Sequence, residues 1–411
     1  GDRVAILCET RPEWTIVDLA VLGFGGVVVG IYPTSTAEQI RYVLEHSESR
    51  VVIVEDQTQL EKVASVRAEL PSLEAVIAID TKPDRADADG PATAYAALRA
   101  SGRAELARKP ALIERCMAAV QPEDTATLVY TSGTTGPPKA VVLTHENLFQ
   151  IADITCRAMK LNEQDVSAVF LPLAHSLQRV SMYAGLRAGL SGYFAPSLDQ
   201  LVETWQAAQP TLMSSVPRVF EKIHNRILTG VGEQPRRRQR IFAAAMSIGR
   251  IRSRFVQRKS PVPWHVDWAF RMVDRLIFSR IRARIFGRRI RYLVSGGAPI
   301  SVELLEFFHA MGLPILEGYG LTETSAPATL NLLDDFRFGT VGKALPEVEV
   351  KTAADGEVLV RGPGVFREYY KDPAATEAAF DEAGWFCTGD IGELDADGFL
   401  RITDRKKDLI I

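Results

Sequence analysis

The sequence predicts an α/β fold made of more than one core. Its 411 residues exceed the roughly 100 to 200 residues of a typical domain. Hydrophobic residues make up 46% and charged residues 24% of the chain, and the mean hydropathy is +0.01, which is typical of a globular protein. Short β-branched runs alternate with helical stretches through most of the length. Disorder, collagen and a coiled coil are therefore poor fits.

The first eighty residues alternate short β-branched runs with segments of helical periodicity. Strands separated by about 10 to 15 helical residues form βαβ units, so a mostly parallel sheet is predicted. The strands are expected at 4–7, 27–31, 51–55 and 75–79, and the helices at 13–22, 37–46 and 60–70. The polar, Ala- and Pro-rich residues 81–122 are expected to form a loop and one surface helix.

A second βα series follows, and the pattern then changes to short strands and turns. The strands of the second series are expected at 126–131, 140–143, 168–171, 192–195, 212–216, 292–295 and 315–318. Later short strands are expected at 348–352, 356–361 and 398–403, which favours a small β-subdomain. We divide the chain into a first α/β subdomain (1–122), a second α/β subdomain (123–337), a small β-subdomain (338–403) and a hinge (404–411).

Net charge and cysteine spacing exclude several classes of protein. The formal net charge is −3, so the chain as a whole has no electrostatic basis for binding nucleic acid. Its cysteines stand singly at Cys8, Cys116, Cys156 and Cys387, which indicates a reducing compartment and no structural metal. The longest uncharged run, residues 19–37, is broken by glycines and is expected to form a buried helix and a strand. We expect a cytoplasmic protein.

Residues 235–291, the basic segment, differ from the rest of the chain. They carry 17 Lys and Arg against two Asp, which gives +15 in 57 residues. Part of the segment is expected to be an amphipathic helix, because apolar side chains recur at helical spacing. These are Val266, Phe270, Val273, Ile277, Ile281 and Ile285. Either the arginine face is merely solvated, or it attracts an anionic substrate or binds peripherally to the inner membrane face.

The most informative motif is a loop between two β-branched runs, Tyr130-Thr-Ser-Gly-Thr-Thr-Gly-Pro-Pro-Lys139. Hydroxyls and backbone N–H groups in such a loop can donate to the oxygens of a polyphosphate. The candidate residues are Thr131, Ser132, Gly133, Thr134, Thr135, Gly136 and Lys139. The spacing is not that of a Walker A motif, because no Gly-Lys-Ser/Thr follows. A linker of the same composition is the alternative.

A second motif, Leu316-Glu-Gly-Tyr-Gly-Leu-Thr-Glu-Thr324, follows an expected strand. Gly318 and Gly320 flank Tyr319, so that the backbone can approach a planar ligand that stacks on the ring. Thr322 and Glu323 supply a hydroxyl and a carboxylate suited to phosphate and Mg²⁺. An ordinary turn with Thr322 as a helix cap is the alternative.

Small residues and a late carboxylate complete the candidate set. Gly297, Ala298 and Pro299 follow another expected strand and are small enough for a ring to lie against the backbone. Asp390 ends the run Trp385-Phe-Cys-Thr-Gly-Asp390, which by itself favours an ordinary turn. The charged segment 404–408 by itself favours a solvated surface turn.

Together these ordered motifs resemble the adenylate-forming superfamily, which includes acyl-CoA synthetases, coumarate CoA ligases, luciferases and peptide-synthetase adenylation domains. The resemblance runs from Gly1-Asp-Arg-Val-Ala-Ile to Asp404-Arg-Lys-Lys-Asp. Within the superfamily, Leu171-Pro-Leu-Ala-His-Ser176, Ser215-Val-Pro-Arg-Val-Phe-Glu-Lys222 and the basic segment look most similar to bacterial long-chain fatty acid CoA ligases.

The resemblance implies a reaction in two steps and a role for each motif. ATP and a long-chain fatty acid give acyl-AMP and pyrophosphate, and the thiol of CoA then displaces AMP to form a thioester. The implied catalytic residues are His175, beside the acyl carboxylate, with Lys139, Thr322 and Glu323 around the phosphates. The implied ligands of Mg²⁺ are Thr134 and Glu323. The implied nucleotide contacts are the phosphate loop, Gly297, Ala298, Pro299, Gly318, Tyr319 and Gly320 around adenine, and Asp390 and Arg405 at the ribose.

Two departures from the family pattern bear on this prediction. Ala140 stands where the family usually has glycine, which matters only if the backbone there needs a positive φ. The chain stops at Ile411, shortly after Lys407 at the family's pivot position. We therefore expect that the chain is an N-terminal portion of such an enzyme and lacks the mobile C-terminal domain with its adenylation lysine. We also expect that the chain begins later than the sequences of the family do.

The residues leave more than one function open. Besides a fatty acid CoA ligase, the sequence is compatible with a fatty acyl-AMP ligase that delivers its product to an acyl carrier protein. A non-catalytic nucleotide or fatty-acid binding protein is the third option. The length of the acid and the oligomeric state, with a homodimer among the options, also stay open.

Overall fold

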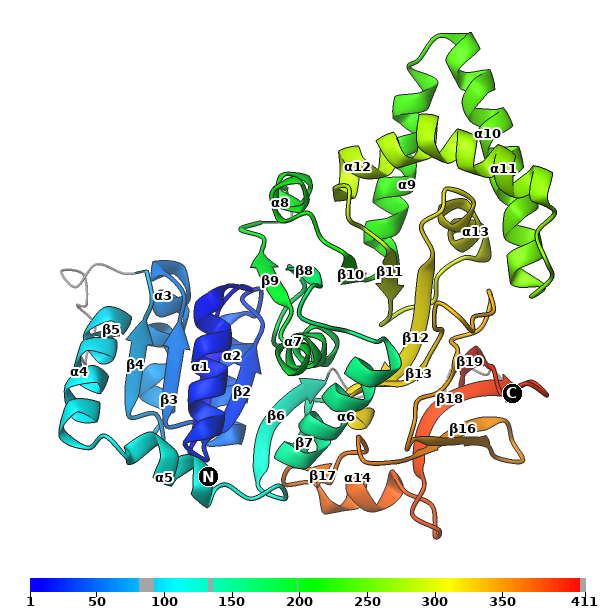
Figure 1. The fold of residues 1–411 in the computed structure, drawn as a ribbon. Coiled ribbons are helices and arrows are strands. Elements are labelled where there is room, and N and C mark those ends of the chain that lie inside the picture. The colour runs from blue at the N-terminus through cyan, green and yellow to red at the C-terminus, as the bar shows by residue number, and fades with distance from the viewer. Residues whose placement is uncertain (81–91, 132–135, 198, 407–411) are drawn as a thin grey trace. The chain divides into compact units, whose positions relative to one another are not determined.

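The computed structural model describes residues 1–80, 92–131, 136–197 and 199–406. Contacts group the chain into two compact units that are discontinuous in sequence (Figure 1). The first unit comprises residues 1–149, 171–179 and 366–378, and the second comprises 150–170, 180–365 and the residues from 379 onward. The predicted linear division at residues 122, 337 and 403 stays a prediction.

The first unit contains a mixed sheet with the strand order β17-β7-β6-β2-β1-β3-β4-β5. Its strands are β1 (Arg3–Leu7), β2 (Val27–Ile31), β3 (Val51–Val54), β4 (Ala75–Ala78), β5 (Thr93–Ala94), β6 (Thr125–Thr131), β7 (Lys139–Thr144) and β17 (Glu368–Tyr369). The pairs from β6 through β5 are parallel, whereas β7 pairs antiparallel with both β6 and β17. Residues 132–138 are too few for a parallel crossover, which needs about a dozen residues or more.

The helices of the first unit begin where the sequence supplies caps. Thr36 and Gln39 form a capping box at the start of α2, and the Asp56 side chain caps α3. The elements are α1 (Pro12–Gly23), α2 (Ala37–Ser47), α3 (Gln57–Val66), η1 (Arg67–Glu69), α4 (Tyr95–Arg108), α5 (Leu112–Ala119) and α14 (Pro373–Ala378). The single surface helix expected before residue 122 is wrong, because α4 and α5 are separate helices with Pro110 between them.

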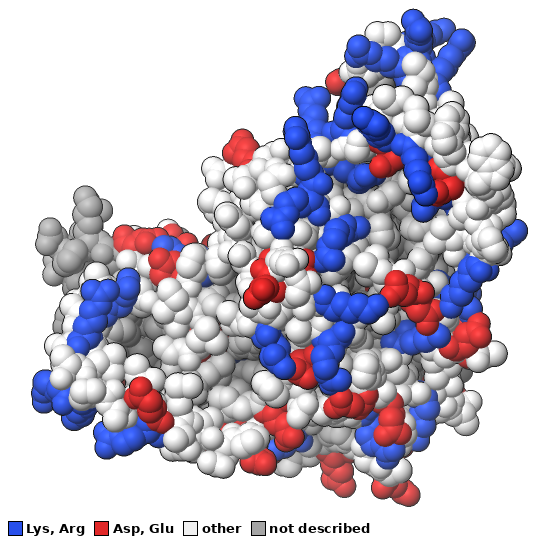
Figure 2. All heavy atoms as spheres, in the orientation of Figure 1, with Lys and Arg blue, Asp and Glu red and all other residues white. Residues whose placement is uncertain are grey.

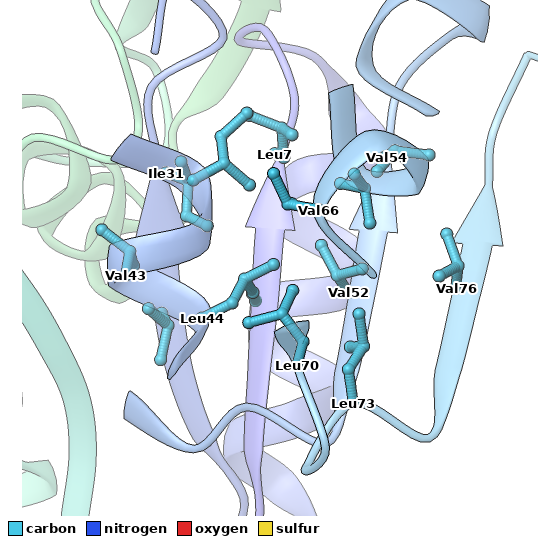
Figure 3. Close-up of a cluster of buried hydrophobic side chains, with 14 of the residues drawn as sticks. Leu7, Ile31, Val43, Leu44, Val52, Val54, Val66, Leu70, Leu73 and Val76 are labelled. Carbon is cyan, nitrogen blue, oxygen red and sulfur yellow. The ribbon is translucent and has the colours of Figure 1, made fainter. Parts of the chain in front are cut away.

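The core of the first unit explains why its β-branched runs became strands. Figure 3 shows aliphatic side chains from the sheet meeting those of α2 and α3. Leu7, Val52 and Val54 are fully buried, and Leu44 on α2 is 1% exposed. Parallel strands that helices cover on both faces consist of continuous apolar residues, and β2 and β3 have that pattern.

The second unit contains two sheets. The larger has the order β14-β13-β12-β11-β10-β8-β9, and the smaller has the order β15-β16-β18-β19. The larger consists of β8 (Val166–Val169), β9 (Ser191–Phe194), β10 (Leu212–Ser215), β11 (Tyr292–Ser295), β12 (Ile315–Leu321), β13 (Ala326–Leu330) and β14 (Lys343–Ala344). The smaller consists of β15 (Glu349–Thr352), β16 (Glu357–Arg361), β18 (Phe386–Leu394) and β19 (Leu400–Arg405). The predicted α/β class is confirmed.

Helices of the second unit follow its parallel strands. They are α8 (Leu201–Ala208), α9 (Pro217–Gly232), α10 (Arg236–Gln257), α11 (Trp264–Val273), the π-helical η3 (Asp274–Phe278), α12 (Ser279–Phe286), α13 (Val302–Ala310) and η4 (Thr322–Thr324). Two more helices, α6 (His145–Ala158) and α7 (Ser176–Ala188), are divided between the units. In Figure 1, α9 to α12 extend away from the strands of the second unit. Within the described ranges, no helix is both long and apolar enough to cross a bilayer.

Candidate functional site

Both ends of the phosphate loop lie at the carboxyl edge of the first unit's sheet. Thr131 is the last residue of β6, and Lys139, the first residue of β7, pairs with it. Because β6 runs parallel to β2, this edge also holds the carboxyl end of β2. Ligands of open α/β sheets bind at this edge. The predicted loop residues Ser132, Gly133, Thr134 and Thr135 lie outside the described residues.

Aromatic residues anchor the loop on both sides. The Tyr42 hydroxyl donates to the carbonyl of Pro138 at 3.0 Å, and His46 Nδ1 lies 2.9 Å from the Tyr130 hydroxyl. Lys139 is exposed, with Nζ 4.8 Å from the ring centroid of Tyr369. Sequence motifs did not point to these anchors, because Tyr42 and His46 belong to the distant helix α2.

Ala140 does not disturb the strand after the loop. It is 1% exposed, pairs with Tyr130 in the regular register of β6 and β7, and is not a residue with positive φ. A side chain is therefore tolerated where the family usually has glycine.

His175 also lies at this edge and is held by the ends of β1 and β2. The Thr10 hydroxyl donates to the carbonyl of Leu171 at 2.8 Å, just after β1. In β2, a Cβ on Gly30 would lie 2.9 Å from Ala174 Cα, so only glycine fits. Two contacts to neighbouring strands therefore fix the turn that presents His175.

The hydrogen bond at Nδ1 of His175 favours a neutral imidazole with its proton on Nε2. Its Nδ1 accepts the backbone N–H of Leu177 at 3.2 Å, which leaves the proton on Nε2. Desolvation lowers the pKa of His175 further below neutrality, although the side chain remains exposed to solvent. An exposed, neutral Nε2–H is suited to donate to a carboxylate oxygen.

Arg179, on α7 close to His175, forms a buried ion pair with Asp18 of α1. The side-chain exposures are 3% and 0%, and a second nitrogen of Arg179 donates to the Thr127 hydroxyl of β6 at 2.6 Å. A buried charge is tolerated only with such partners. The pair ties the His175 turn to α1 and the sheet, and the sequence did not indicate it.

In the second unit, the glycine-rich segments follow adjacent parallel strands. β11 pairs with β12 so that Ser295 opposes Glu317, and Gly296 to Pro299 therefore begin beside Gly318. Gly297 has φ +79°, and Gly297, Ala298 and Pro299 are exposed. This places the two predicted adenine segments at one edge of the sheet.

The glycines around Tyr319 have a steric reason. A Cβ on Gly320 would lie 2.1 Å from the carbonyl oxygen of Ala326, and one on Gly318 would lie 2.9 Å from Leu330. The pairing of β12 with β13 shifts register between Tyr319 and Gly320, as in a β-bulge. Gly320 is thus required by the backbone of β13, in addition to the ligand approach that the sequence suggested, whereas Gly318 meets the end of a side chain.

Tyr319, Asp390 and Arg405 come together although they are far apart in sequence. The Tyr319 hydroxyl donates to Asp390 Oδ2 at 2.7 Å, and Arg405 Nε lies 3.2 Å from Oδ1. Asp390 is 5% exposed, whereas Arg405 is exposed. Burial and then the Asp390 charge raise the pKa of Tyr319, so that its hydroxyl stays a donor. A buried carboxylate with charged and neutral donors is a preorganised acceptor for ligand hydroxyls.

Thr322 and Glu323 form the short helix η4 directly after β12, and both are half-buried. Within the described ranges, no group of three or more His, Cys, Asp or Glu side chains could hold a metal ion. A metal at Glu323 would therefore need ligands from elsewhere, such as substrate phosphates.

A row of buried polar residues that the sequence did not single out crosses β10, β11 and β12. Ser215 pairs with Ser295, and Ser295 with Glu317, so their side chains share one face of the sheet. Within the described part of the chain, both serine hydroxyls are buried without a hydrogen-bond partner. Burial raises the pKa of Glu317 to about 7, against a smaller lowering by the Ile300 N–H.

Comparison with known proteins then decides the family. A family model described as AMP-binding enzyme matches residues 1–370. The chain belongs to this family. It is 39% identical, over its whole length, to the long-chain-fatty-acid–CoA ligase FadD15 of Mycobacterium bovis and of Mycobacterium tuberculosis. It is 34% identical to the peroxisomal long chain acyl-CoA synthetase 6 of Arabidopsis thaliana.

The chain spans about two thirds of the length of its curated relatives, with 66% of each FadD15 and 58% of the plant enzyme covered. The N-terminal domain of FACL13 from Mycobacterium tuberculosis has a similar structure (TM-score 0.71, 22% identity, 98% of this chain and 86% of that chain). So does a fatty acyl CoA synthetase of the same organism (TM-score 0.73, 24% identity, 100% and 69%). These likenesses support the shared fold.

The raised pKa of Glu317 gives a pH-dependent prediction. The folded state holds a proton that the unfolded state releases between about pH 4.5 and 7, so the buried carboxyl costs stability as the pH rises through this range. The free energy of unfolding of Glu317→Gln, relative to that of the parent protein, should rise by on the order of 1 to 3 kcal/mol between pH 5 and pH 8. Urea unfolding at both pH values measures this. Glu303→Gln, on the exposed face of α13, is the control, and an equal effect of Glu317→Gln at both pH values would contradict the prediction.

Proposed function

We propose that this chain is the nucleotide- and acyl-binding part of an AMP-forming long-chain fatty acid CoA ligase. The contact of Tyr319 and Arg405 with the buried Asp390 carries this proposal, because it gives a family member a preorganised ribose site. The names of the relatives support a long-chain acid and CoA as substrates. The alternatives of a carrier-protein acceptor and of a non-catalytic binding protein have no observation in their favour.

The first step requires a carboxylate to approach the anionic α-phosphate of ATP. An oxygen of the fatty acid forms a bond to the α-phosphorus, and pyrophosphate leaves with the electron pair of the broken bond. Electrostatic repulsion opposes this approach, so donors must neutralise the phosphates and hold the reactants in line. We assign this work to the phosphate loop with Lys139, and to Thr322 at the α-phosphate.

Two further roles complete the first step. The neutral Nε2–H of His175 would orient the fatty acid carboxylate without taking its charge away. Tyr319 would lie against adenine with Gly297, Ala298 and Pro299, while Asp390 and Arg405 bind the ribose hydroxyls. In the second step, the CoA sulfur forms a bond to the acyl carbonyl carbon and its thiol proton passes to solvent. AMP leaves with the electron pair of the broken bond between the acyl carbon and the phosphate oxygen.

Mg²⁺ is proposed as the accompanying cation. It is usually bound through one or two carboxylates together with substrate phosphates, and Glu323 on η4 fits such a donor set, with Thr134 as the second proposed ligand. When bound, the ion would neutralise phosphate charge and stabilise the leaving pyrophosphate.

The nucleotide site is tested by calorimetric titration with a non-hydrolysable fatty acyl-AMP mimic. We expect binding that Asp390→Ala weakens at least tenfold, which is about 1.4 kcal/mol, because the ribose loses its buried acceptor. Asp390→Asn should be weakened less, since an amide oxygen can still accept from Tyr319. Glu393→Ala, an exposed residue of the same strand β18, is the matched control. Equal affinity of all variants would contradict the assigned site.

We also propose that the basic segment binds peripherally to anionic membrane on the cytoplasmic side. Figure 2 shows Lys and Arg gathered over α9 to α12. Many of these arginines form no ion pair with another described residue, namely Arg236, Arg237, Arg238, Arg240, Arg250, Arg254, Arg258, Arg275, Arg280 and Arg284. Unpaired charge of one sign favours an anionic partner.

An exposed apolar stripe between these charges favours a membrane over a small anion. Trp264, Trp268, Met272 and Leu276 recur every four residues along α11 and η3, with exposures of 80%, 62%, 43% and 51%. The predicted apolar face of this helix, which includes Phe270, instead points inward. Tryptophans next to arginines are characteristic of segments that lie in the membrane interface.

Vesicle binding tests this surface. Replacing Arg236, Arg237, Arg238 and Arg240 with Gln should weaken binding to anionic vesicles at least tenfold at low salt, since each surface arginine contributes about 1 kcal/mol. Trp264→Ser with Trp268→Ser should remove the part of the binding that salt does not screen. Sedimentation with phosphatidylserine-containing vesicles measures both.

The control replaces the same number of arginines on α4 and α5 of the first unit, Arg99, Arg103, Arg108 and Arg115. These changes should leave vesicle binding unaltered. No binding at low salt, or equal binding to uncharged vesicles, would show that the basic segment is not an anionic-membrane surface.

A further inference from the structure

A carboxylate without an assigned role lies behind the proposed ribose contact. Glu357 is the first residue of β16 and is 8% exposed. Its Oε1 accepts the backbone N–H of Gly389 at 2.8 Å, and its Oε2 lies 2.7 Å from Nζ of Lys406. One buried side chain therefore holds the residue before Asp390 and the residue after Arg405.

These contacts close a ring of five residues, which we call the Glu357 ring: Glu357, Gly389, Asp390, Arg405 and Lys406. The ring is completed by Asp390 and Arg405, which pair across β18 and β19. The distance from Arg405 Nε to Asp390 Oδ1 is 3.2 Å. The backbone inside the ring is constrained further, because Gly389 has φ +71°, a conformation that disfavours other residues. The orientation of Asp390 thus depends on contacts that lie outside the ligand site.

A second pair of hydrogen bonds holds the same part of β18, residues 388–390. The Thr388 hydroxyl donates to the carbonyl of Val358 at 2.7 Å and accepts the N–H of Asp390 at 3.1 Å. The first two residues of β16, Glu357 and Val358, therefore both hold this part of β18. A carboxylate this buried, with one backbone donor and one ammonium donor, is a strong fixed acceptor.

Lys406 has a second partner of a different kind. Its Nζ also lies 2.7 Å from Asp355 Oδ2, but Asp355 is half-exposed and does not contact Gly389. The side-chain hydrogen bond with Asp355, and then that with Glu357, raise the pKa of Lys406, so the ammonium stays charged. Asp355 therefore provides an internal control, since it shares Lys406 with Glu357 but does not accept the N–H of Gly389.

We infer that Glu357 is a positioning residue, which orients Asp390 for the ribose hydroxyls and couples that orientation to Lys406. This inference rests on the proposed function, because it takes the ribose as the ligand of Asp390. Glu357 touches no substrate itself and acts through Gly389 on one side and Lys406 on the other.

The test compares two adenylate mimics, one with both ribose hydroxyls and one that is 2′,3′-dideoxy, by calorimetry. Glu357→Gln keeps an acceptor for Gly389 but removes the ion pair with Lys406, and it should lower affinity for the ribose form about fivefold to twentyfold. It should leave affinity for the dideoxy form unchanged, since Asp390 then has no hydroxyls to bind. Lys406→Met, an exposed change that is compatible with folding, should behave in the same way.

The double variant Glu357→Gln with Lys406→Met should be no weaker than either single variant, because both remove one interaction. Asp355→Asn should bind both mimics like the parent protein. Equal losses for the two mimics would show a merely structural role and overturn the inference, as would no loss with Glu357→Gln. If the parent protein does not prefer the ribose form, the proposed ribose site itself fails, which is a different outcome.

Discussion

The second unit depends on the contacts of one almost buried carboxylate, that of Asp390. Asp390 is 5% exposed, and a carboxylate at such a position needs hydrogen-bond partners in place of water. The Tyr319 hydroxyl and the Arg405 guanidinium compensate for the lost water, and they come from two different sheets of the second unit. Asp390 therefore joins those sheets, and we propose that the same carboxylate is the acceptor for the ribose hydroxyls.

Close backbone approach is the second constraint. Gly320 lies where a Cβ would collide with the carbonyl of Ala326, and Gly30 lies where one would collide with Ala174. Each glycine lets a strand end pack against the segment that presents a candidate residue, Tyr319 in one unit and His175 in the other. The same glycine can thus serve packing and the site together, because a site at a strand end needs its neighbours close.

Local patterns predicted much of the fold, and non-local contacts account for what they missed. The apolar runs around Val29 and Val52 correctly predicted β2 and β3, because buried parallel strands are continuously apolar. β18 was not predicted as a strand, because its residues 386–394 mix glycine, charge and apolar side chains around a shift in register. The motifs located Tyr319 and Asp390, but Glu357 and Arg179 act through partners that are distant in sequence, and a linear pattern carries no signal for such pairs.

We propose that these residues activate a fatty acid with ATP. The most direct measurement is the exchange of labelled pyrophosphate into ATP by the protein, with and without a long-chain fatty acid and in the absence of CoA. Formation of an acyl-AMP intermediate predicts exchange that requires the fatty acid and does not require CoA. No exchange with fatty acids of any length, or exchange that is equally fast without them, would contradict the claim.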